Sequence, residues 1–140
     1  MTRIAGDDLF LGTWRLQPEL SKYELGQPPQ EGLYRITRDG ESYIFDTTWK
    51  TAEGQQLETS FSGTPDGQRV AYEDPEIADA LSLTRVDELT LDSESFKGGW
   101  RIALARRELI NGGMSMRVTQ SGQVPDVAAF SNISYYHKLD

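Results

Sequence analysis

Residues 32–50, with the sequence GLYRITRDGESYIFDTTWK, carry the clearest structural signal in the chain. From Ser42 to Lys50 apolar and polar side chains alternate, and this period of two is typical of a half-buried β-strand. One face of this strand carries Tyr43, Phe45, Thr47 and Trp49. Upstream, Asp39-Gly40 favours the positive φ angles of a tight type I′ turn. The pattern therefore predicts an antiparallel hairpin in which residues 33–38 pair with the strand from Ser42 to Lys50.

Similar short alternating segments, separated by turn residues, run through the rest of the chain. Thr64-Pro65-Asp66-Gly67 is a typical turn sequence, and Gly98-Gly99 and Gly112-Gly113 follow other segments. Together with the hairpin, the segments number about ten, at the spacing of an all-β sandwich or barrel. The other predicted strands are residues 12–17, 56–63, 68–72, 80–86, 88–96, 100–109, 114–121 and 127–138. We expect a single up-and-down antiparallel barrel of about 8–10 strands, with residues 1–140 as one domain.

Two stretches depart from the strand pattern. Prolines and glycines interrupt any ladder between residues 18 and 30, so one helical turn or a loop across an open end of the barrel is expected there. Before the first strand, DDLF at residues 7–10 fits a short helical plug capped by Asp7 or Asp8. A polar break around Pro75 separates the strands on either side of it.

The composition narrows the classes of function. The 140 residues include 14 Lys and Arg against 22 Asp and Glu, and the formal net charge of −8 would repel nucleic acid and anionic membrane surfaces. There is no cysteine, which excludes disulfides, thiolate metal sites and cysteine nucleophiles. No apolar run approaches the roughly 18 residues of a membrane-spanning helix, and the N-terminal stretch has acidic residues where a signal peptide is apolar. We therefore expect a cytoplasmic protein with no nucleic-acid or membrane partner.

The beginning of the chain adds a resemblance to a known family. Gly12-Thr13-Trp14, in the first predicted strand, resembles the Gly-x-Trp signature of lipocalins and other calycins, whose tryptophan closes the barrel floor. The longer stretch GTWRLQPELSKY, residues 12–23, is similar to small bacterial lipocalin-like proteins of unassigned function. Those proteins continue with a Gly-Pro-rich link and end in a Tyr-x-Lys strand, matched here by Tyr136-His137-Lys138. The resemblance implies a barrel in which Gly12 allows a bend at the floor and Trp14 plugs that end.

A barrel of about ten strands is wider than its own side chains can fill, so we expect an interior chamber. The candidate lining residues are Tyr43, Phe45, Trp49, Phe61 and Trp100. The alternative is that these rings form the packed core of a smaller barrel or sandwich. The first interpretation predicts a small apolar or aromatic ligand, and the second leaves no room for one.

Polar residues of the last strands bear on the nature of the ligand. In the related fatty-acid-binding proteins, an arginine and a tyrosine two residues apart on the last strand hold the ligand carboxylate. Here Tyr136 matches the tyrosine, whereas Ser134 stands in place of the arginine. Arg117 on the neighbouring strand is a candidate for the missing cation, but its alternation with Met116 and Val118 also fits a solvated arginine. A neutral apolar or aromatic ligand is therefore preferred over a fatty acid.

The only histidine, His137, would have to serve any imidazole-dependent mechanism, haem site or imidazole-bound metal. It lies three residues from the end of the sequence, and alternation with Tyr136 points it outward. The acidic residues between 87 and 94 lack the fixed spacing of a metal-binding loop. We therefore predict neither a metal nor a cofactor.

Two classes of function remain. The preferred one is a non-catalytic protein that shelters a small apolar or aromatic ligand inside the barrel. The alternative is a lipocalin-fold enzyme, a lyase, cyclase or isomerase acting on an aromatic or lipid-like substrate, with Tyr136 as acid and Arg117 as anchor. A filled barrel that contacts another protein stays open as well, and so does a homodimer.

Overall fold

The computed structural model describes residues 8–24, 26–71, 78–122 and 130–139. They form antiparallel strands with two single turns of 3-10 helix, η2 (Pro18–Leu20) and η3 (Asn111–Gly113). The strands are β1 (Gly12–Leu16), β2 (Lys22–Tyr23), β3 (Glu31–Asp39), β4 (Ser42–Lys50), β5 (Gln56–Gly63), β6 (Val70–Ala71), β7 (Ala80–Asp87), β8 (Thr90–Lys97), β9 (Trp100–Ile110), β10 (Ser115–Gly122) and β11 (Phe130–Lys138). No helix in these residues has the length and apolar character needed to cross a membrane. The predicted all-β class is confirmed.

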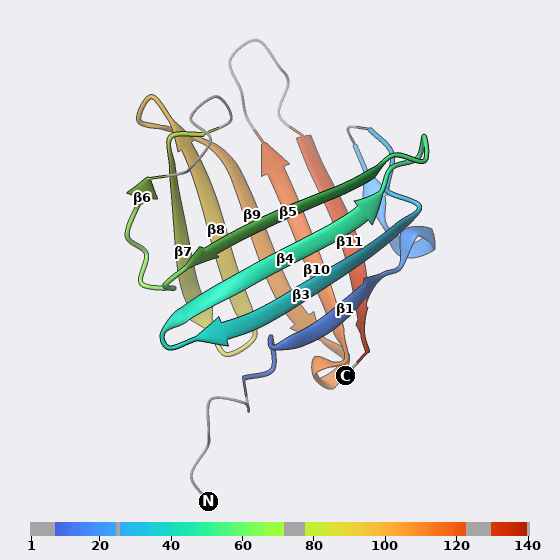
Figure 1. The fold of residues 1–140 in the computed structure, drawn as a ribbon, viewed down its shortest axis with the longest axis horizontal. Coiled ribbons are helices and arrows are strands. Elements are labelled where there is room, and N and C mark those ends of the chain that lie inside the picture. Colours follow the sequence, from blue (N-terminus) through green and yellow to red (C-terminus); the bar gives the residue numbers. More distant parts are fainter. Residues whose placement is uncertain (1–7, 25, 72–77, 123–129, 140) are drawn as a thin grey trace, which may run out of the picture.

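All eleven strands belong to one antiparallel sheet that curls on itself (Figure 1). The main path runs β5-β4-β3-β1-β11-β10-β9-β8-β7-β6, with β2 beside β11, so most neighbours in the sheet are also neighbours in sequence. Strand β1 joins the first and last parts of the chain, because Arg15 lies opposite Leu33 of β3 and opposite His137 of β11. In Figure 1, β3, β4 and β5 cross in front of β7 to β10, and these two groups of strands form the two facing walls of the barrel. This is the up-and-down barrel expected from the sequence.

The turn that follows β5 contacts β7, which lies near the other end of the sheet. Asp66 forms an isolated antiparallel bridge with Thr84 of β7, and the Gly67 amide donates to the Leu83 carbonyl oxygen at 2.8 Å. Within the described residues, β5 and β7 are not hydrogen-bonded neighbours in the sheet. Gly67 has a φ of +80°, which glycine adopts without steric cost. The turn predicted at residues 64–67 therefore also connects the end of β5 to β7.

The β3–β4 hairpin confirms the predicted strand pairing, but its turn is shifted by one residue. Asp39 lies opposite Ser42, so Gly40 and Glu41 form the two-residue loop. Gly40 has a φ of +62°. Glu41 does not have a positive φ, because Asn111 is the one described residue other than glycine that does. A type I′ turn needs two positive φ angles, so the predicted turn type is wrong and glycine alone takes the left-handed conformation.

The segment between β1 and β3 combines the helical turn and the loop expected of it, with η2 beginning at Pro18. The two-residue strand β2 was not predicted, because so short a segment shows no alternation; its Lys22 lies opposite Ile133 of β11. Residues 9–10 form a turn rather than a helix, and the Phe10 amide donates to Asp8 Oδ1 at 3.0 Å. Asp7, residues 127–129 of the last predicted strand and residues 73–77 of the polar break lie outside the described residues.

Large side chains fill one end of the barrel. Phe10 and Trp14 are fully buried there, and the Trp14 indole Nε1 donates to the Phe10 carbonyl oxygen at 3.1 Å. The Lys138 ammonium lies 5.4 Å from the centre of the Trp14 ring. Gly12 has a φ of +138°, a conformation that other residues rarely adopt, in agreement with the bend expected at this position. The rest of the cluster comprises Tyr34, Ile36, Tyr43, Phe45, Leu83, Leu91, Leu109, Met116 and Val118.

A partly buried polar cluster connects the chain before β1 to both walls. Asp8 accepts hydrogen bonds from the Tyr43 hydroxyl and, at 3.0 Å, from Arg85 Nη1. Arg85 Cζ also lies 5.0 Å from the centre of the Phe10 ring. Burial opposes ionisation of Asp8, but the hydrogen bonds from Tyr43, the Phe10 amide and Arg85 outweigh it and hold the pKa of Asp8 below its usual value.

Replacing Trp14 with alanine removes the largest ring from the filled end, and we expect the free energy of unfolding to fall by about 3–5 kcal/mol. Trp100→Ala is the matched control, because this indole is 78% exposed and its loss should change stability by less than about 0.5 kcal/mol. Urea unfolding followed by circular dichroism measures both. Equal losses in the two variants would contradict the structural role of Trp14.

The lowered pKa of Asp8 predicts a specific acid sensitivity. A carboxylate whose pKa is lower in the folded state stabilises the protein above the unfolded-state pKa, and this contribution is lost as the pH falls through the folded-state pKa. Asp8→Asn should therefore be less stable than the wild type at about pH 6 and should lose less further stability by about pH 3. Urea midpoints at the two pH values test this, and an identical acid-induced loss in both proteins would rule it out.

Candidate ligand-binding site

Beside the filled end, the barrel encloses a cavity of about 850 Å³. Small-molecule sites are typically about 300–1,000 Å³, so this volume suits a ligand of ordinary size. Exposed Gly26 and Gln27 line the cavity on one side and exposed Ala52 and Glu53 on another. The loop before β3 and the β4–β5 turn therefore frame its mouth.

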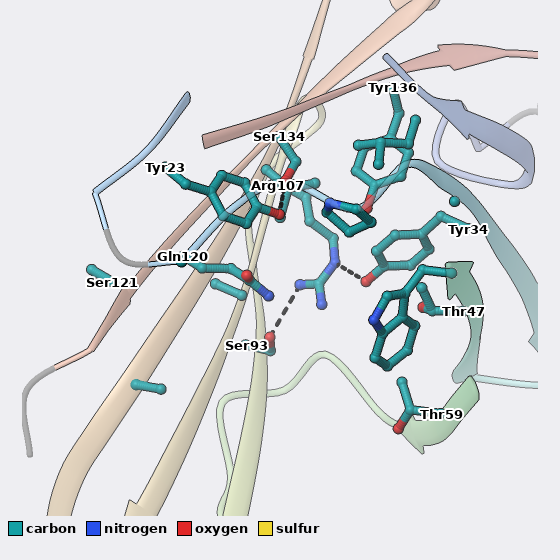
Figure 2. A pocket seen from close by; sticks show the side chains of 18 of the residues that line it. Tyr23, Tyr34, Thr47, Thr59, Ser93, Arg107, Gln120, Ser121, Ser134 and Tyr136 are labelled. Carbon is teal, nitrogen blue, oxygen red and sulfur yellow. Dashed lines mark hydrogen bonds between the residues drawn. The ribbon is translucent and has the colours of Figure 1, made fainter. Parts of the chain in front are cut away.

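Arg107 of β9 lies at the inner end of the cavity, and it is only 2% exposed (Figure 2). Alternation along β9 turns Ala103, Ala105 and Arg107 toward the cavity. The Arg107 guanidinium donates from Nε to the Tyr34 hydroxyl at 2.7 Å and from Nη1 to Ser93 Oγ at 3.2 Å. These two hydrogen bonds hold the planar group between β3 and β8.

Aromatic rings surround this guanidinium. Arg107 Cζ lies 4.7 Å from the centre of the Phe45 ring, 5.7 Å from that of Tyr34 and 5.8 Å from that of Phe61. The faces of aromatic rings attract a cation, and they offset part of the cost of removing it from water. The Arg107 charge is thus accommodated by hydroxyl groups and rings.

No carboxylate of the described residues pairs with Arg107. The four ion pairs found in this part of the chain use Arg85, Arg101, Arg106 and Arg117. A buried charge in a protein is normally matched by an opposite charge. The inner end of the cavity therefore presents a positive charge that suits the anionic group of a ligand, and the planar guanidinium favours a carboxylate.

Tyr136 of β11 adds a second polar group near Arg107. Its ring contacts the Tyr34 ring edge to face, with ring centres 5.5 Å apart and planes at 88°. Burial raises the pKa of Tyr136, so its hydroxyl stays protonated and is a hydrogen-bond donor at neutral pH. Ser134, two residues earlier on the same strand, shares a hydrogen bond of 2.9 Å with the Tyr23 hydroxyl.

Three of the predicted ligand-binding residues, Trp49, Phe61 and Tyr136, line the cavity. Phe45 lies beneath Arg107 in the filled end, and Tyr43 lies in the same cluster beside Asp8. Tyr43, Phe45 and Trp49 share one face of β4, as predicted, but only the second half of that strand borders the cavity. The sequence pattern identifies the inward face of β4, but it does not show where along this strand the packed core ends and the cavity begins.

Trp100 and Arg117 lie away from the cavity, which corrects their predicted positions. Trp100 is 78% exposed at the start of β9, and the pairing of β8 with β9 shifts register next to it, between Ser95 and Phe96. Arg117 lies on the outer face of β10, where its Nε donates to Glu108 at 3.3 Å. The solvated alternative for Arg117 is therefore the correct one, because Met116 and Val118 occupy the inward positions.

Arg107 is the residue that the sequence analysis missed. Reading residues 100–109 by hydrophobicity turns Trp100, Ile102 and Leu104 inward and Arg107 outward. In the structure Trp100 is exposed and Ile102 does not line the cavity, whereas Ala103, Ala105 and Arg107 line it together with Leu104. A strand that borders a cavity needs no bulky apolar side chains on its inward face. The pattern Ala-x-Ala-x-Arg at residues 103–107 is therefore the sequence feature that could have identified this inward face.

Metal binding finds no support in the described residues, among which no group of His, Asp and Glu side chains could hold an ion. His137 is exposed on β11, as its alternation with Tyr136 predicts.

Sequence comparisons find no matching family and no matching curated protein. Comparisons of structure do find matches. The Schistosoma mansoni fatty acid binding protein in complex with arachidonic acid has 15% identity and a TM-score of 0.63 over 94% of this chain and 97% of that chain. Apo lipid binding protein 8 of Caenorhabditis elegans has 14% identity and a TM-score of 0.63 over 98% and 100%. The zebrafish ileal bile acid-binding protein complexed with cholic acid has 12% identity and a TM-score of 0.56 over 94% and 99%. The chain therefore shares the fold of these lipid-binding and bile-acid-binding proteins.

Tyr34→Phe removes the acceptor of the Arg107 Nε–H bond, and we expect it to lower the free energy of unfolding by about 1–3 kcal/mol, because a buried charged donor is left unpaired. Tyr136→Phe is the control, since its hydroxyl has no hydrogen-bond partner among the described residues, and the loss should be smaller. Urea unfolding compares the two variants. A larger loss in Tyr136→Phe would show that the Tyr34–Arg107 bond does not have the role assigned to it.

Proposed function

We propose that this protein binds a small, mostly apolar carboxylate inside the barrel, with Arg107 holding the carboxylate group. The observation that carries the proposal is the buried guanidinium that faces the cavity without a carboxylate partner in the described chain. The sequence alone favoured a neutral ligand, because Ser134 replaces the arginine of the last strand. Arg107 supplies a cation from β9 instead, so an acid becomes the preferred ligand.

Two hydroxyl groups beside Arg107 support this position for the carboxylate. The Tyr34 hydroxyl oxygen accepts the Arg107 Nε–H, so its own O–H is available to donate. Tyr136 is a protonated hydroxyl on the neighbouring wall. The apolar part of the ligand would then extend from the inner end toward the mouth, past Trp49 and Phe61, which line the cavity.

The structural matches support an acidic, mostly apolar ligand. Two of the matching proteins were solved with arachidonic acid and cholic acid, and both ligands are named as acids. Membership of the small bacterial lipocalin-like proteins, the cytoplasmic location and the homodimer stay predictions from the sequence.

The enzymatic alternative gains no support. Besides Tyr136, the acid of that alternative, acid–base chemistry in the cavity would usually call for a base such as a carboxylate or an imidazole close to Tyr136 or Arg107. Among the described lining residues, Glu53 at the mouth is the one acidic side chain. A non-catalytic binding protein is therefore the function we propose.

A pair of ligands that differ only in the head group tests the proposal. Dodecanoate should bind at least about tenfold more tightly than 1-dodecanol, because the carboxylate gains charge-assisted hydrogen bonds from Arg107. In Arg107→Gln the affinity for dodecanoate should fall to that for the alcohol. Isothermal titration calorimetry measures both dissociation constants.

Arg117→Gln is the matched control, since it removes the same charge from the outer face of the barrel and should leave both affinities unchanged. Circular dichroism checks that each variant is folded. The comparison of acid with alcohol in the wild type is informative even where Arg107→Gln does not fold. Equal affinities for the two ligands in the wild type would overturn the proposal, and so would equal weakening by Arg117→Gln.

A further inference from the structure

The two walls of the cavity differ in the kind of side chain that they present. We propose that the ligand is a planar aromatic carboxylate rather than a flexible alkyl carboxylate. This inference rests on the proposed function, because it concerns the same cavity and the same Arg107.

The wall made by β3, β4 and β5 carries aromatic rings, which alternate with the smaller lining residues Gly32, Thr47 and Thr59. Trp49 and Phe61 line the cavity there, and the Phe61 ring stacks on Phe45 with ring centres 4.6 Å apart and planes at 19°. Tyr34 and Tyr136, in edge-to-face contact, continue this surface toward β11. We call the four rings that line the cavity, Trp49, Phe61, Tyr34 and Tyr136, the aromatic wall.

Small side chains predominate in the facing part of the cavity on β8 and β9, where Leu104 and Arg107 are the two larger lining residues. Ser93 lies directly opposite Ala105 in the register of the two strands, and Ser95 lies opposite Ala103. All four line the cavity, and we call them the small-residue patch. Side chains of this size leave a shallow, even recess where larger residues would fill the space.

The small-residue patch begins next to Arg107, the residue proposed to bind the carboxylate. Arg107 lies two residues from Ala105 on the same face of β9, and its Nη1 donates to Ser93 Oγ at 3.2 Å. At a rise of roughly 3.3 Å per residue, the distance along β9 from Arg107 to Ala103 is about 13 Å. A ligand whose carboxylate contacts Arg107 therefore lies between the small-residue patch and the aromatic wall.

A slot between small residues and aromatic rings favours a rigid planar group. A fused ring system stacks on Phe61 and Trp49, and aromatic contacts of this kind add to the gain from burial alone. A rigid ring system also loses less conformational freedom on binding than an alkyl chain does. A flexible chain gains neither advantage, so the shape of the slot distinguishes the two classes of acid.

The test compares three ligands in the 140-residue protein: 4-(1-pyrenyl)butyrate, 4-(1-pyrenyl)butan-1-ol and hexadecanoate. We expect the wild type to bind pyrenylbutyrate at least about tenfold more tightly than hexadecanoate. Arg107→Gln should weaken the binding of both acids. Calorimetry measures all affinities, and the pyrene fluorescence gives an independent reading for two of the ligands.

Two variants of the slot test its shape. Phe61→Leu keeps an apolar side chain but removes the ring, and should weaken pyrenylbutyrate about threefold to tenfold while changing hexadecanoate less than about twofold. Ala103→Phe fills the recess and should also affect pyrenylbutyrate more. Trp100→Leu, which removes an exposed ring outside the cavity, is the matched control and should change neither affinity.

The outcomes separate this inference from the proposed function. Hexadecanoate that binds as tightly as pyrenylbutyrate, with both acids weakened by Arg107→Gln, overturns the aromatic ligand and leaves the carboxylate site standing. Pyrenylbutanol that binds as tightly as pyrenylbutyrate overturns the carboxylate site itself. Equal weakening of both acids by Phe61→Leu overturns the stacking role of the aromatic wall, and the conservative Phe61→Leu variant keeps that test available where Ala103→Phe does not fold.

Discussion

The buried positive charge of Arg107 is the constraint on which the interior of this barrel depends. Its guanidinium is held by hydroxyl groups of Tyr34 and Ser93 and faces the Phe45 and Phe61 rings, so β3, β4, β5 and β8 must converge on one side chain of β9. Because water is largely excluded there, these contacts have to replace its hydration. Arg107 also marks the boundary inside the barrel, with packed core on one side and cavity on the other.

The core of the filled end packs against Arg107, since the Phe45 ring of this core lies next to the guanidinium. Phe10 packs there with Trp14 of β1, the strand that joins the beginning and the end of the chain, and Asp8 and Arg85 connect this region to both walls. The mouth is framed by loops that contribute little to the core cluster. The packed core and the mouth of the cavity are thus located at different ends of the molecule, and Arg107 lies between them.

Much of the fold follows from the sequence, whereas only part of the site does. Alternation and turn residues identify the β3–β4 hairpin and most of the strands, and Gly12 and Trp14 mark the filled end. The same reasoning fails on β9, because it assumes that inward positions are apolar. Beside a cavity they carry alanine and arginine, and Trp100 lies outside. Arg107 and Arg117 are chemically identical. Alternation with Met116 and Val118 indicates the outward position of Arg117, whereas on β9 hydrophobicity indicates the wrong face for Arg107.

The ionisation state of a bound carboxylate tests the central claim most directly. NMR of carboxyl-¹³C dodecanoate in the complex reports whether the head group is charged as the pH is lowered from about 8 to about 5.5. An ionised carboxylate on Arg107 predicts a resonance that stays at its ionised position throughout, whereas in Arg107→Gln the apolar surroundings should raise the pKa of the ligand into this range. A wild-type resonance that titrates as it does in Arg107→Gln would contradict the carboxylate site.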